Sequence, residues 1–349
     1  MRAITLAPGV PHSAKLEDIA EPPESQGSIL VRTLALGVCG TDREIVRGEY
    51  GEAPPGSNRL VLGHESYGEV IAAPPGNRFV VGDHIVGIVR RPDPVPCPSC
   101  AAGEWDMCCN GQYTERGIKG LHGYGAERFR IEPAYAIKID PRLGSRGVLL
   151  EPTSVVAKAW DHIERVGRRF HSWEPKRLLV TGAGPVGLLA AMMGAQRNYD
   201  IYVLDRATDG PKPALVHDLG GRYLTSTIEE VADLAPDVII ECTGAPGLIA
   251  GVMGRTAPSG IVCLLGLGGH HESTFDFGQF NKTMVLNNGV VLGSVNANRR
   301  HYEMAATALA NADAAWLDRL VSRRVPLSNW QEALDNRPDD IKVVVDFTR

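Results

Sequence analysis

In the second half of the chain, the apolar and polar positions form a regularly repeating pattern. Short apolar runs at residues 178–181, 200–204, 237–244, 260–266 and 290–296 alternate with helical stretches. Continuous apolar runs of this length, bounded by turn residues, predict strands buried on both faces. Strands alternating with helices are typical of a parallel, doubly wound sheet. We therefore expect an α/β domain here.

The first half has a different pattern. Shorter β-like runs at 28–34 and 79–87 are broken by proline and glycine, which predicts a partly barrel-shaped domain. Residues 151–166 carry an apolar stripe at helical spacing. Towards the end of the chain, 327–334 predicts a helix and 341–347 a final strand. The last segment is expected to return to the first domain.

A chain of 349 residues is too long for one ordinary core, which indicates two domains. We assign 1–155 and 297–349 to the first domain and 156–296 to the second. The helix at 151–166 is expected to bridge them, and a functional site shared by both domains would lie in the cleft between them.

Composition narrows the class of protein. The formal net charge of −5, without a basic block, argues against nucleic acid as a partner. The longest apolar runs are far shorter than the ~20 residues that span a bilayer, and the N-terminus lacks the apolar core of a signal peptide. Seven cysteines with C-x-x-C spacing point to metal rather than disulfides. These features predict a cytoplasmic protein without a membrane partner.

The strongest local motif is a glycine-rich turn between an apolar strand and a helix. Gly182, Gly184 and Gly187 form G-x-G-x-x-G in the context that dinucleotide binding requires. The first glycine permits the tight turn, the second lets the backbone approach a pyrophosphate, and the third allows close packing of helix on strand. Phosphates are expected at the helix N-terminus. The candidate cofactor contacts are Gly182, Ala183, Gly184, Pro185, Val186 and Gly187 in the turn, with Thr243, Leu265, Gly266, Ser294, Val295 and Asn296 at later strand ends.

The residues after the second strand give a mixed signal on the cofactor. Asp205 is placed to accept hydrogen bonds from a ribose 2′-hydroxyl and to repel a 2′-phosphate, which favours NAD. The adjacent Arg206, with Lys212 in the following loop, would accommodate that phosphate and keeps NADP open.

The first half offers a candidate metal site. Cys39, in GVCGTD, and His64 and Glu65, in GHES, supply a thiolate, an imidazole and a carboxylate. Such ligands suit zinc, and three of them leave a fourth position for substrate or water. Taken singly, the alternatives are a buried core cysteine and a hydrogen-bonded histidine.

These motifs and their order resemble the zinc-dependent medium-chain dehydrogenase/reductase superfamily over the whole chain. GVCGTD, then GHE, then a C-x-x-C lobe and a Rossmann segment is that layout. Residues 113–123, 151–160 and 293–296 resemble the glucose 1-dehydrogenase branch in particular. The resemblance implies a GroES-like catalytic domain joined to a Rossmann domain, and an oligomer, either a dimer or a tetramer.

The resemblance also implies roles for residues. Cys39, His64 and Glu65 would bind the catalytic zinc, and Thr41 would hydrogen-bond the reacting hydroxyl and pass its proton outward. The positions that match sugar-contacting residues of the branch are Glu115, Glu151 and Asn296, and Glu151 would also approach the metal. The simpler interpretations are a solvated loop charge for Glu115 and a helix N-terminal charge for Glu151.

The cysteine-rich segment 93–109 departs from the superfamily pattern. Cys97, Cys100 and Cys108 match the second, third and fourth ligands of a structural zinc, but the first position is Pro94. Asp93 is the expected replacement. A closed structural zinc has no open coordination position, so this segment would stiffen a lobe rather than catalyse. A loop without metal is the alternative.

Together these features predict a zinc-dependent oxidoreductase that transfers hydride from C1 of an aldose, D-glucose first, to NAD or NADP. A polyol, aminocyclitol or threonine dehydrogenase is the alternative within the same chemistry. A metal-free relative of the quinone reductases is a further alternative, and the presence of Cys39, His64 and Glu65 argues against it.

Overall fold

The computed structural model describes residues 1–268 and 272–349. The chain forms two compact units, one of Met1–Ser154 with Asn296–Arg349 and one of Val155–Val295. Each unit has its own sheets and is described by itself.

The second unit is built on a six-stranded sheet in the order β14-β13-β12-β15-β16-β17, and all its pairings are parallel. The strands are β12 (Arg177–Thr181), β13 (Asp200–Leu204), β14 (Arg222–Leu224), β15 (Val238–Glu241), β16 (Ile261–Leu264) and β17 (Val290–Gly293). The order reverses between β12 and β15, as in a doubly wound sheet. The predicted fold class is confirmed, although β14 has too short an apolar run to be recognised from the sequence.

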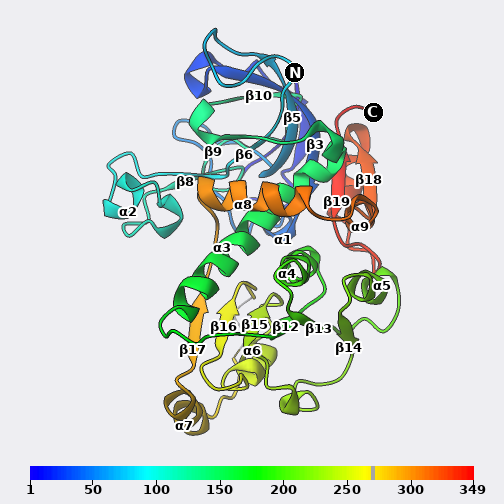
Figure 1. The fold of residues 1–349 in the computed structure, drawn as a ribbon. Helices are drawn as coiled ribbons and strands as arrows, with labels where there is room; N and C mark the ends of the chain where they lie inside the picture. Colours follow the sequence, from blue (N-terminus) through cyan, green and yellow to red (C-terminus); the bar gives the residue numbers. More distant parts are fainter. Residues whose placement is uncertain (269–271) are drawn as a thin grey trace. The chain divides into compact units, whose positions relative to one another are not determined.

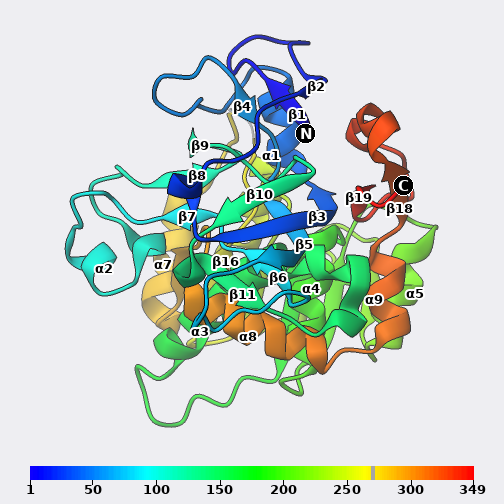
Figure 2. The ribbon, with the colours of Figure 1, turned by 90° about the horizontal axis from the view of Figure 1, so that it is seen from above.

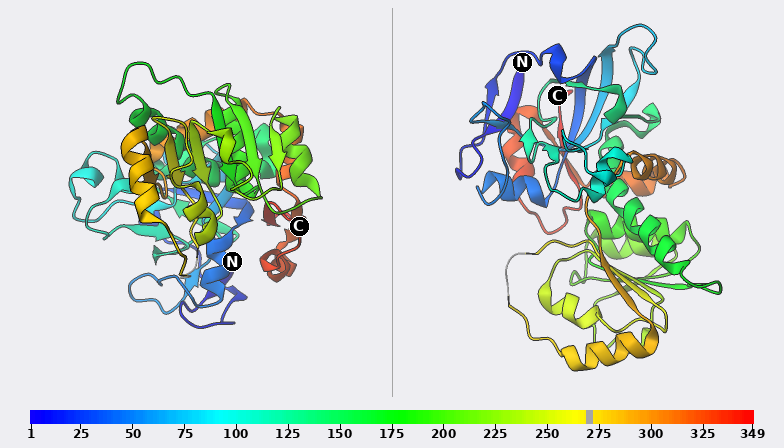
Figure 3. Two further views of the ribbon diagram at one scale, coloured as in Figure 1. Left: turned by 90° about the horizontal axis from the view of Figure 1, so that it is seen from below. Right: turned by 90° about the vertical axis from the view of Figure 1, so that its left-hand side faces the viewer.

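Helices cover both faces of this sheet, with α4 and α5 on one side and α6 and α7 on the other (Figure 1). They are α3 (Leu150–Gly167), which begins in the first unit, and α4 (Pro185–Ala195), α5 (Pro211–Asp218), α6 (Pro246–Val252) and α7 (Phe277–Asn287), with a 3₁₀ turn η5 at Ala232–Leu234. The predicted helix over 151–166 is thus present as α3. Figure 3 shows α7 in gold at the end of the sheet away from β14.

The first unit contains three sheets. The largest has the order β11-β6-β5-β3-β19-β18, with β10 also paired to β3, and two three-stranded sheets have the orders β2-β1-β4 and β7-β8-β9. In Figure 2, β3 lies between β10 and β5. The strands are β1 (Arg2–Leu6), β2 (Lys15–Asp18), β3 (Ile29–Val38), β4 (Leu60–Val61), β5 (Glu65–Ala72), β6 (His84–Gly87), β7 (Arg90–Arg91), β8 (Thr114–Arg116), β9 (Gly120–Leu121), β10 (Arg128–Ile131), β11 (Ala136–Lys138), β18 (Arg323–Pro326) and β19 (Val343–Asp346).

The first unit also contains helices and 3₁₀ turns. They are α1 (Gly40–Val46), α2 (Pro98–Ala101), α8 (Arg299–Ala310) and α9 (Ala314–Leu320), with 3₁₀ turns η1 (Glu24–Gln26), η2 (Trp105–Met107), η3 (Pro133–Tyr135), η4 (Pro141–Leu149) and η6 (Leu327–Leu334). The cysteine-rich segment carrying α2 and η2 projects from the strands of this unit (Figure 2).

Two predicted elements differ from the structure. In the run 79–87 only His84–Gly87 is a strand, because a turn at Val80–Asp83 closes with the Asp83 amide donating to the Val80 carbonyl. Val80 is 59% exposed there, so an apolar residue in a turn made the predicted strand too long. The segment 327–334 forms 3₁₀ turns that bend at Asn329 rather than one α-helix.

The two β-rich cores explain why the strands form where they do. In the first unit, alternate residues of β3 such as Ile29 and Val31 are fully buried, as expected for strands that pack one face inward. In the second unit the whole run Leu178–Thr181 is buried, because helices cover both sides. No helix in the described ranges is long and apolar enough to cross a membrane.

Candidate metal and cofactor sites

Three of the predicted ligands converge in the first unit. Cys39 precedes α1, while His64 and Glu65 lie at the start of β5, and the ligand atoms of the three lie within 4.8 Å of one another. The Cys39 sulfur is 3.0 Å from Nε2 of His64. His64 and Glu65 are 5% and 1% exposed and Cys39 is half-buried, so a sulfur, an imidazole and a carboxylate meet with little access to solvent.

Asp42, to which no sequence motif gave a role, supports this group from α1. Its Oδ2 accepts from the Cys39 amide at 2.9 Å, and its Oδ1 lies 3.3 Å from Nδ1 of His64. Those last two atoms are buried, and neither has another hydrogen-bond partner among the described residues. A carboxylate behind Nδ1 fixes the tautomer that leaves Nε2 free to bind a metal.

The charges of this group favour a cation. Burial opposes protonation of His64, but the Cys39 sulfur and the Asp42 carboxylate outweigh it and raise the His64 pKa well above its ordinary value. A place that attracts a proton so strongly also attracts a metal ion. The donor set and its burial therefore fit zinc.

Lys342, on the short segment before β19, completes the surroundings of Glu65. Its Nζ lies 2.6 and 2.7 Å from the two oxygens of Glu65, and both side chains are 2% exposed. Burial alone would lower the Lys342 pKa, but Glu65 and Cys39 raise it, so the lysine is charged. Gly37 makes room, since a Cβ there would lie 2.1 Å from an oxygen of Glu65.

Glu151 interacts through its charge with His64, Glu65 and Lys342, whereas Thr41 is near the group by its place two residues after Cys39. Glu151 is 9% exposed in the first turn of α3, so it is no solvated helix-end charge. Burial raises its pKa to about 7, and the Glu65 charge adds to the rise while His64 and Lys342 oppose it. Thr41, in the first turn of α1, is half-buried.

Glu115 and Asn296, which are far apart in sequence, also meet. Nδ2 of Asn296 donates to Oε1 of Glu115 at 2.8 Å, and the same oxygen accepts from Arg90 at 3.0 Å. Glu115 is 5% exposed, which excludes the solvated-loop interpretation. Arg90 was not singled out in the sequence.

The cysteine-rich lobe brings together three of its four predicted ligands. The sulfurs of Cys97, Cys100 and Cys108 form a second group within 4.8 Å of one another, and this group, as found in the described residues, does not include Asp93. The Asp93 Oδ1 instead accepts from the Val95 amide at 2.7 Å, which turns the carboxylate towards its own backbone. Its Oδ2 is buried without a hydrogen-bond partner within the described ranges.

Amides of the lobe prepare one of these thiols for metal binding. The Cys109 and Cys100 amides lower the pKa of Cys97 to about 6, whereas burial raises the pKa of Cys100 to about 11. Thiolates are the metal-binding form of cysteine. The three sulfurs therefore fit three of the four ligand positions of a structural zinc ion.

The glycine turn of the second unit has the geometry that its sequence predicts. Gly182 has φ +90°, a conformation that favours glycine. A Cβ on Gly187 would lie 1.8 Å from the Gly182 carbonyl oxygen, so a side chain there is excluded. Gly184, the residue before α4, has open space above it, and a Cβ at that position would meet no atom within 4 Å among the described residues. That space and the free amides of α4 fit a pyrophosphate.

Asp205 lies at the carboxyl end of β13 and lines one pocket with Gly182, Arg206, Lys212 and Thr243. Its oxygens accept from the amides of Ala183 and Ala207 at 2.6 and 2.9 Å. Burial would raise its pKa, but these amides and Lys212, 3.5 Å away, lower it.

A buried carboxylate that no sequence motif marks organises the next strand end. Glu241, the last residue of β15, is 0% exposed and accepts from the Thr243 amide at 2.7 Å and the Gly244 amide at 3.1 Å. Its carbonyl accepts from the amides of Leu265 and Gly266. These bonds place two of the predicted contact segments at one edge of the sheet.

The last predicted contacts follow β17. The Ser294 amide donates to the Leu264 carbonyl at 3.0 Å, and the Val295 carbonyl accepts from Nζ of Lys158 at 2.9 Å. Lys158 is 1% exposed on α3. Nothing local in the sequence marks Lys158 or Lys342, because their partners are more than a hundred residues away.

Comparisons with known proteins agree with this arrangement. Residues 25–141 match the family described as alcohol dehydrogenase GroES-like domain, and residues 144–347 match the glucose dehydrogenase C-terminus family. Glucose 1-dehydrogenase 2 of Vulcanisaeta moutnovskia is 40% identical and glucose 1-dehydrogenase of Thermoproteus tenax 42% identical, each over 99% of both chains. The structure of Haloferax mediterranei glucose dehydrogenase in complex with NADP, Zn and gluconolactone matches with a TM-score of 0.92 at 33% identity, covering all of both chains.

A GroES-like domain with a Cys–His–Glu group, joined in one chain to a Rossmann domain, defines the zinc-dependent medium-chain dehydrogenases/reductases. Within that superfamily the chain belongs to the glucose 1-dehydrogenase branch. The resemblance stated from the sequence is confirmed.

Proposed function

We propose that this protein is a zinc-dependent glucose 1-dehydrogenase that oxidises D-glucose at C1 to the lactone with NAD or NADP. The observation that carries the proposal is the Cys39–His64–Glu65 group, half-buried at Cys39 and buried at the other two residues, in a chain related over its full length to glucose 1-dehydrogenases. The reaction moves one hydride from C1 to the nicotinamide and releases the hydroxyl proton to solvent.

Cys39, His64 and Glu65 would hold the zinc ion, and Asp42 and Lys342 would orient His64 and Glu65. A zinc ion bound there lowers the pKa of a coordinated hydroxyl and stabilises the developing alkoxide. Thr41 is the proposed route for the leaving proton, since it follows a ligand closely in the chain and is half-buried. Glu151, with its pKa near neutrality, is placed to accept or hold a proton beside the same group.

Glu115, Asn296 and Glu151 are proposed to bind the sugar hydroxyls. A polyhydroxylated substrate requires several buried acceptors and donors, because an unpaired hydroxyl in a dry site is costly. The pair of Glu115 and Asn296 is buried or half-buried and offers both kinds of group.

For the cofactor, we propose that Gly182–Gly187 holds the pyrophosphate and that Asp205 contacts the adenosine ribose. The Asp205 carboxylate is anionic, which favours a 2′-hydroxyl over a 2′-phosphate. Arg206 and Lys212 line the same pocket and moderate that preference, so both NAD and NADP are expected to be accepted. The remaining proposed contacts are Thr243, Leu265, Gly266, Ser294, Val295 and Asn296.

Three further properties are proposed with this function. The cysteine lobe would hold a structural zinc by Cys97, Cys100 and Cys108, and seven free thiols suit the cytoplasm. A homo-oligomer is supported by α7, on which Phe277, Val285 and Leu286 are 68–72% exposed beside the edge strand β17. Such an apolar face is typical of an interface.

The proposal is tested by initial rates of NADH and NADPH formation with D-glucose, before and after removal of zinc by a chelator. Turnover that is lost with zinc and returns when zinc is restored is the expected result. A protein that binds zinc but leaves glucose untouched would overturn the sugar assignment, and polyols and amino alcohols would be assayed next. A Cys39→Ser variant with full activity would overturn the zinc mechanism.

A further inference from the structure

Glu115 is held so that one oxygen is occupied and the other is free. Three nitrogens, two of Arg90 at 3.0 Å and Nδ2 of Asn296 at 2.8 Å, all contact Oε1. In the described part of the chain, Oε2 has no such donor and keeps its lone pairs for a ligand. The arrangement fixes which oxygen of the carboxylate is presented to a hydroxyl group.

Arg90 is itself fixed by two further contacts. Its guanidinium lies 3.7 Å from the centre of the Tyr113 ring, and Nη1 donates to the carbonyl of Asp106 at 3.3 Å. The arginine is 4% exposed, so the atoms packed around it leave room for few other side-chain conformations. Arg90 thus connects the strand β7 to both Glu115 and the cysteine lobe.

The other member of the sugar pair is tied to the same point of the lobe. Asn296 has φ +60°, and its own Oδ1 accepts from the Ala297 amide, which orients the side-chain amide towards Glu115. Two residues later, Nδ2 of Asn298 donates to the Asp106 Oδ1 at 2.8 Å, and this bond is buried. Asp106 therefore restrains the Asn296 segment through its side chain and Arg90 through its backbone.

Asp106 lies in η2, between Cys100 and Cys108 of the lobe. We propose that Arg90 and Asp106 are positioning residues for the sugar, which hold Glu115 and Asn296 in place and make sugar affinity depend on an ordered cysteine lobe. The proposal rests on the proposed function, because it takes Glu115 and Asn296 as sugar contacts. It gives the lobe a part in substrate binding in addition to stiffening its own segment.

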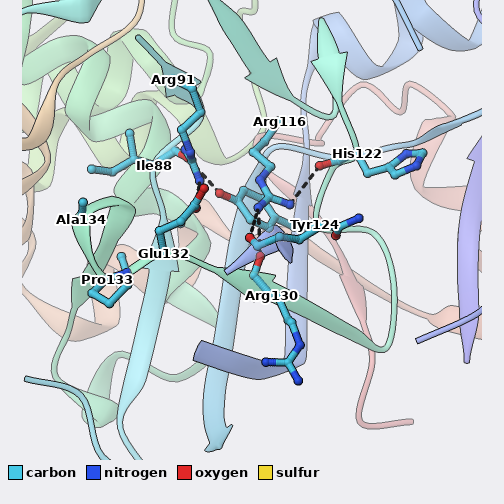
Figure 4. Close-up of polar contacts among 12 residues, drawn as sticks. Ile88, Arg91, Arg116, His122, Tyr124, Arg130, Glu132, Pro133 and Ala134 are labelled. Atoms are coloured by element: carbon cyan, nitrogen blue, oxygen red, sulfur yellow. Dashed lines mark hydrogen bonds and ion pairs between the residues drawn. The ribbon is translucent and has the colours of Figure 1, made fainter. Parts of the chain in front are cut away.

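The chain provides a matched control in the neighbouring arginine. Arg91 is also buried on β7, its guanidinium lies 3.9 Å from the Tyr135 ring, and it donates to the Ile88 carbonyl at 2.7 Å. Its carboxylate partner is Glu132 at 3.3 Å, and Figure 4 shows Arg91 beside Glu132 and Ile88. Arg91 therefore has the same kind of contacts as Arg90 without touching the sugar pair.

The test compares Arg90→Gln, Arg90→Lys and Arg91→Gln with the wild-type zinc-loaded enzyme. For each protein we would measure kcat and KM for D-glucose, the dissociation constant of NADPH by fluorescence, the melting temperature and the zinc content. A hydrogen bond to a charged group contributes enough for Arg90→Gln to raise the glucose KM about tenfold or more. The NADPH constant should stay unchanged, Arg90→Lys should restore part of the loss, and Arg91→Gln should lower the melting temperature without changing the glucose KM.

Asp106→Ala tests the second restraint, and it should raise the glucose KM in the same direction while kcat changes less. Unchanged glucose KM in both Arg90→Gln and Asp106→Ala would overturn the inference. An equal rise in Arg91→Gln would also overturn it, since the effect would then be general loosening of the unit. If Arg90→Gln fails to fold, Arg90→Lys carries the comparison. Wild-type enzyme without glucose turnover would overturn the proposed function and this inference together, whereas wild-type turnover with unresponsive variants would overturn the inference alone.

Discussion

Replacing Lys342 by methionine tests whether the metal group depends on a buried cation. The substitution keeps an unbranched side chain of similar length but removes the charge that contacts both oxygens of Glu65 at 2.6 and 2.7 Å. In the zinc-free protein, Glu65 would be left as a buried carboxylate without its main partner. With zinc bound, the metal takes over part of that role.

The expected loss can be derived from the geometry. Two unit charges at this separation attract by about 6 kcal/mol at an effective dielectric constant of about 20, and desolvation of both groups offsets part of this. Removing one partner of a buried pair costs about 3–5 kcal/mol. For a unit of this size that corresponds to a fall in melting temperature of roughly 6–20 °C. The zinc-loaded variant should lose less.

The pH dependence has a definite sign. Burial would lower the Lys342 pKa, but Glu65 and Cys39 outweigh it and raise the Lys342 pKa in the folded wild type. A lysine with a raised folded pKa stabilises the fold fully below its unfolded pKa and loses that contribution as pH rises through the folded value. The deficit of Lys342→Met relative to wild type should therefore persist up to about pH 10, close to the ordinary pKa of a lysine, and shrink above it.

The assay is calorimetry and urea unfolding of zinc-stripped and zinc-loaded protein, for wild type, Lys342→Met, Glu65→Gln and the double variant. The double variant lacks the unpaired charge and should be more stable than Lys342→Met. A zinc-stripped Lys342→Met protein within about 1 kcal/mol of wild type near neutral pH, less than the smallest loss expected, would refute the reasoning, as would a double variant no more stable than the single one.

Three other substitutions test the nucleotide site and the lobe. Gly187→Ala places a methyl group 1.8 Å from the Gly182 carbonyl oxygen before any relaxation. It should weaken NADPH binding on the order of a hundredfold in a fluorescence titration. A weakening of less than about threefold, which is under 1 kcal/mol, would contradict this prediction. Asp205→Ser removes the charge that repels a 2′-phosphate and should raise the ratio of kcat/KM for NADP over NAD about tenfold, while an unchanged ratio would place the ribose elsewhere. Cys100→Ser should release one zinc per chain and lower the melting temperature, measured by metal analysis and calorimetry; unchanged zinc content would show that the lobe holds none.

Local sequence was sufficient for the fold class and for the motifs that carry the chemistry. Buried parallel strands need continuous apolar runs, and the glycine turn needs residues without a Cβ, so both are visible over a few neighbouring positions. The family resemblance, now confirmed, followed from GVCGTD, GHE and GAGPVG in order. Where apolar residues were exposed, as at Val80, the same pattern predicted too long a strand.

The tertiary structure decided which buried charged and polar side chains contact one another. Lys342 meets Glu65 across 277 positions, and Asn296 meets Glu115 across 181, because distant segments are brought together in the first unit. It also set the Oδ1 atom of Asp93 against the amide of Val95 and left Oδ2 buried without a hydrogen-bond partner among the described residues. Periodicity reports whether a side chain is buried, since burial recurs along a helix or strand. It carries no information on the partner that a buried charge finds, and in a dry interior that partner sets both pKa and stability.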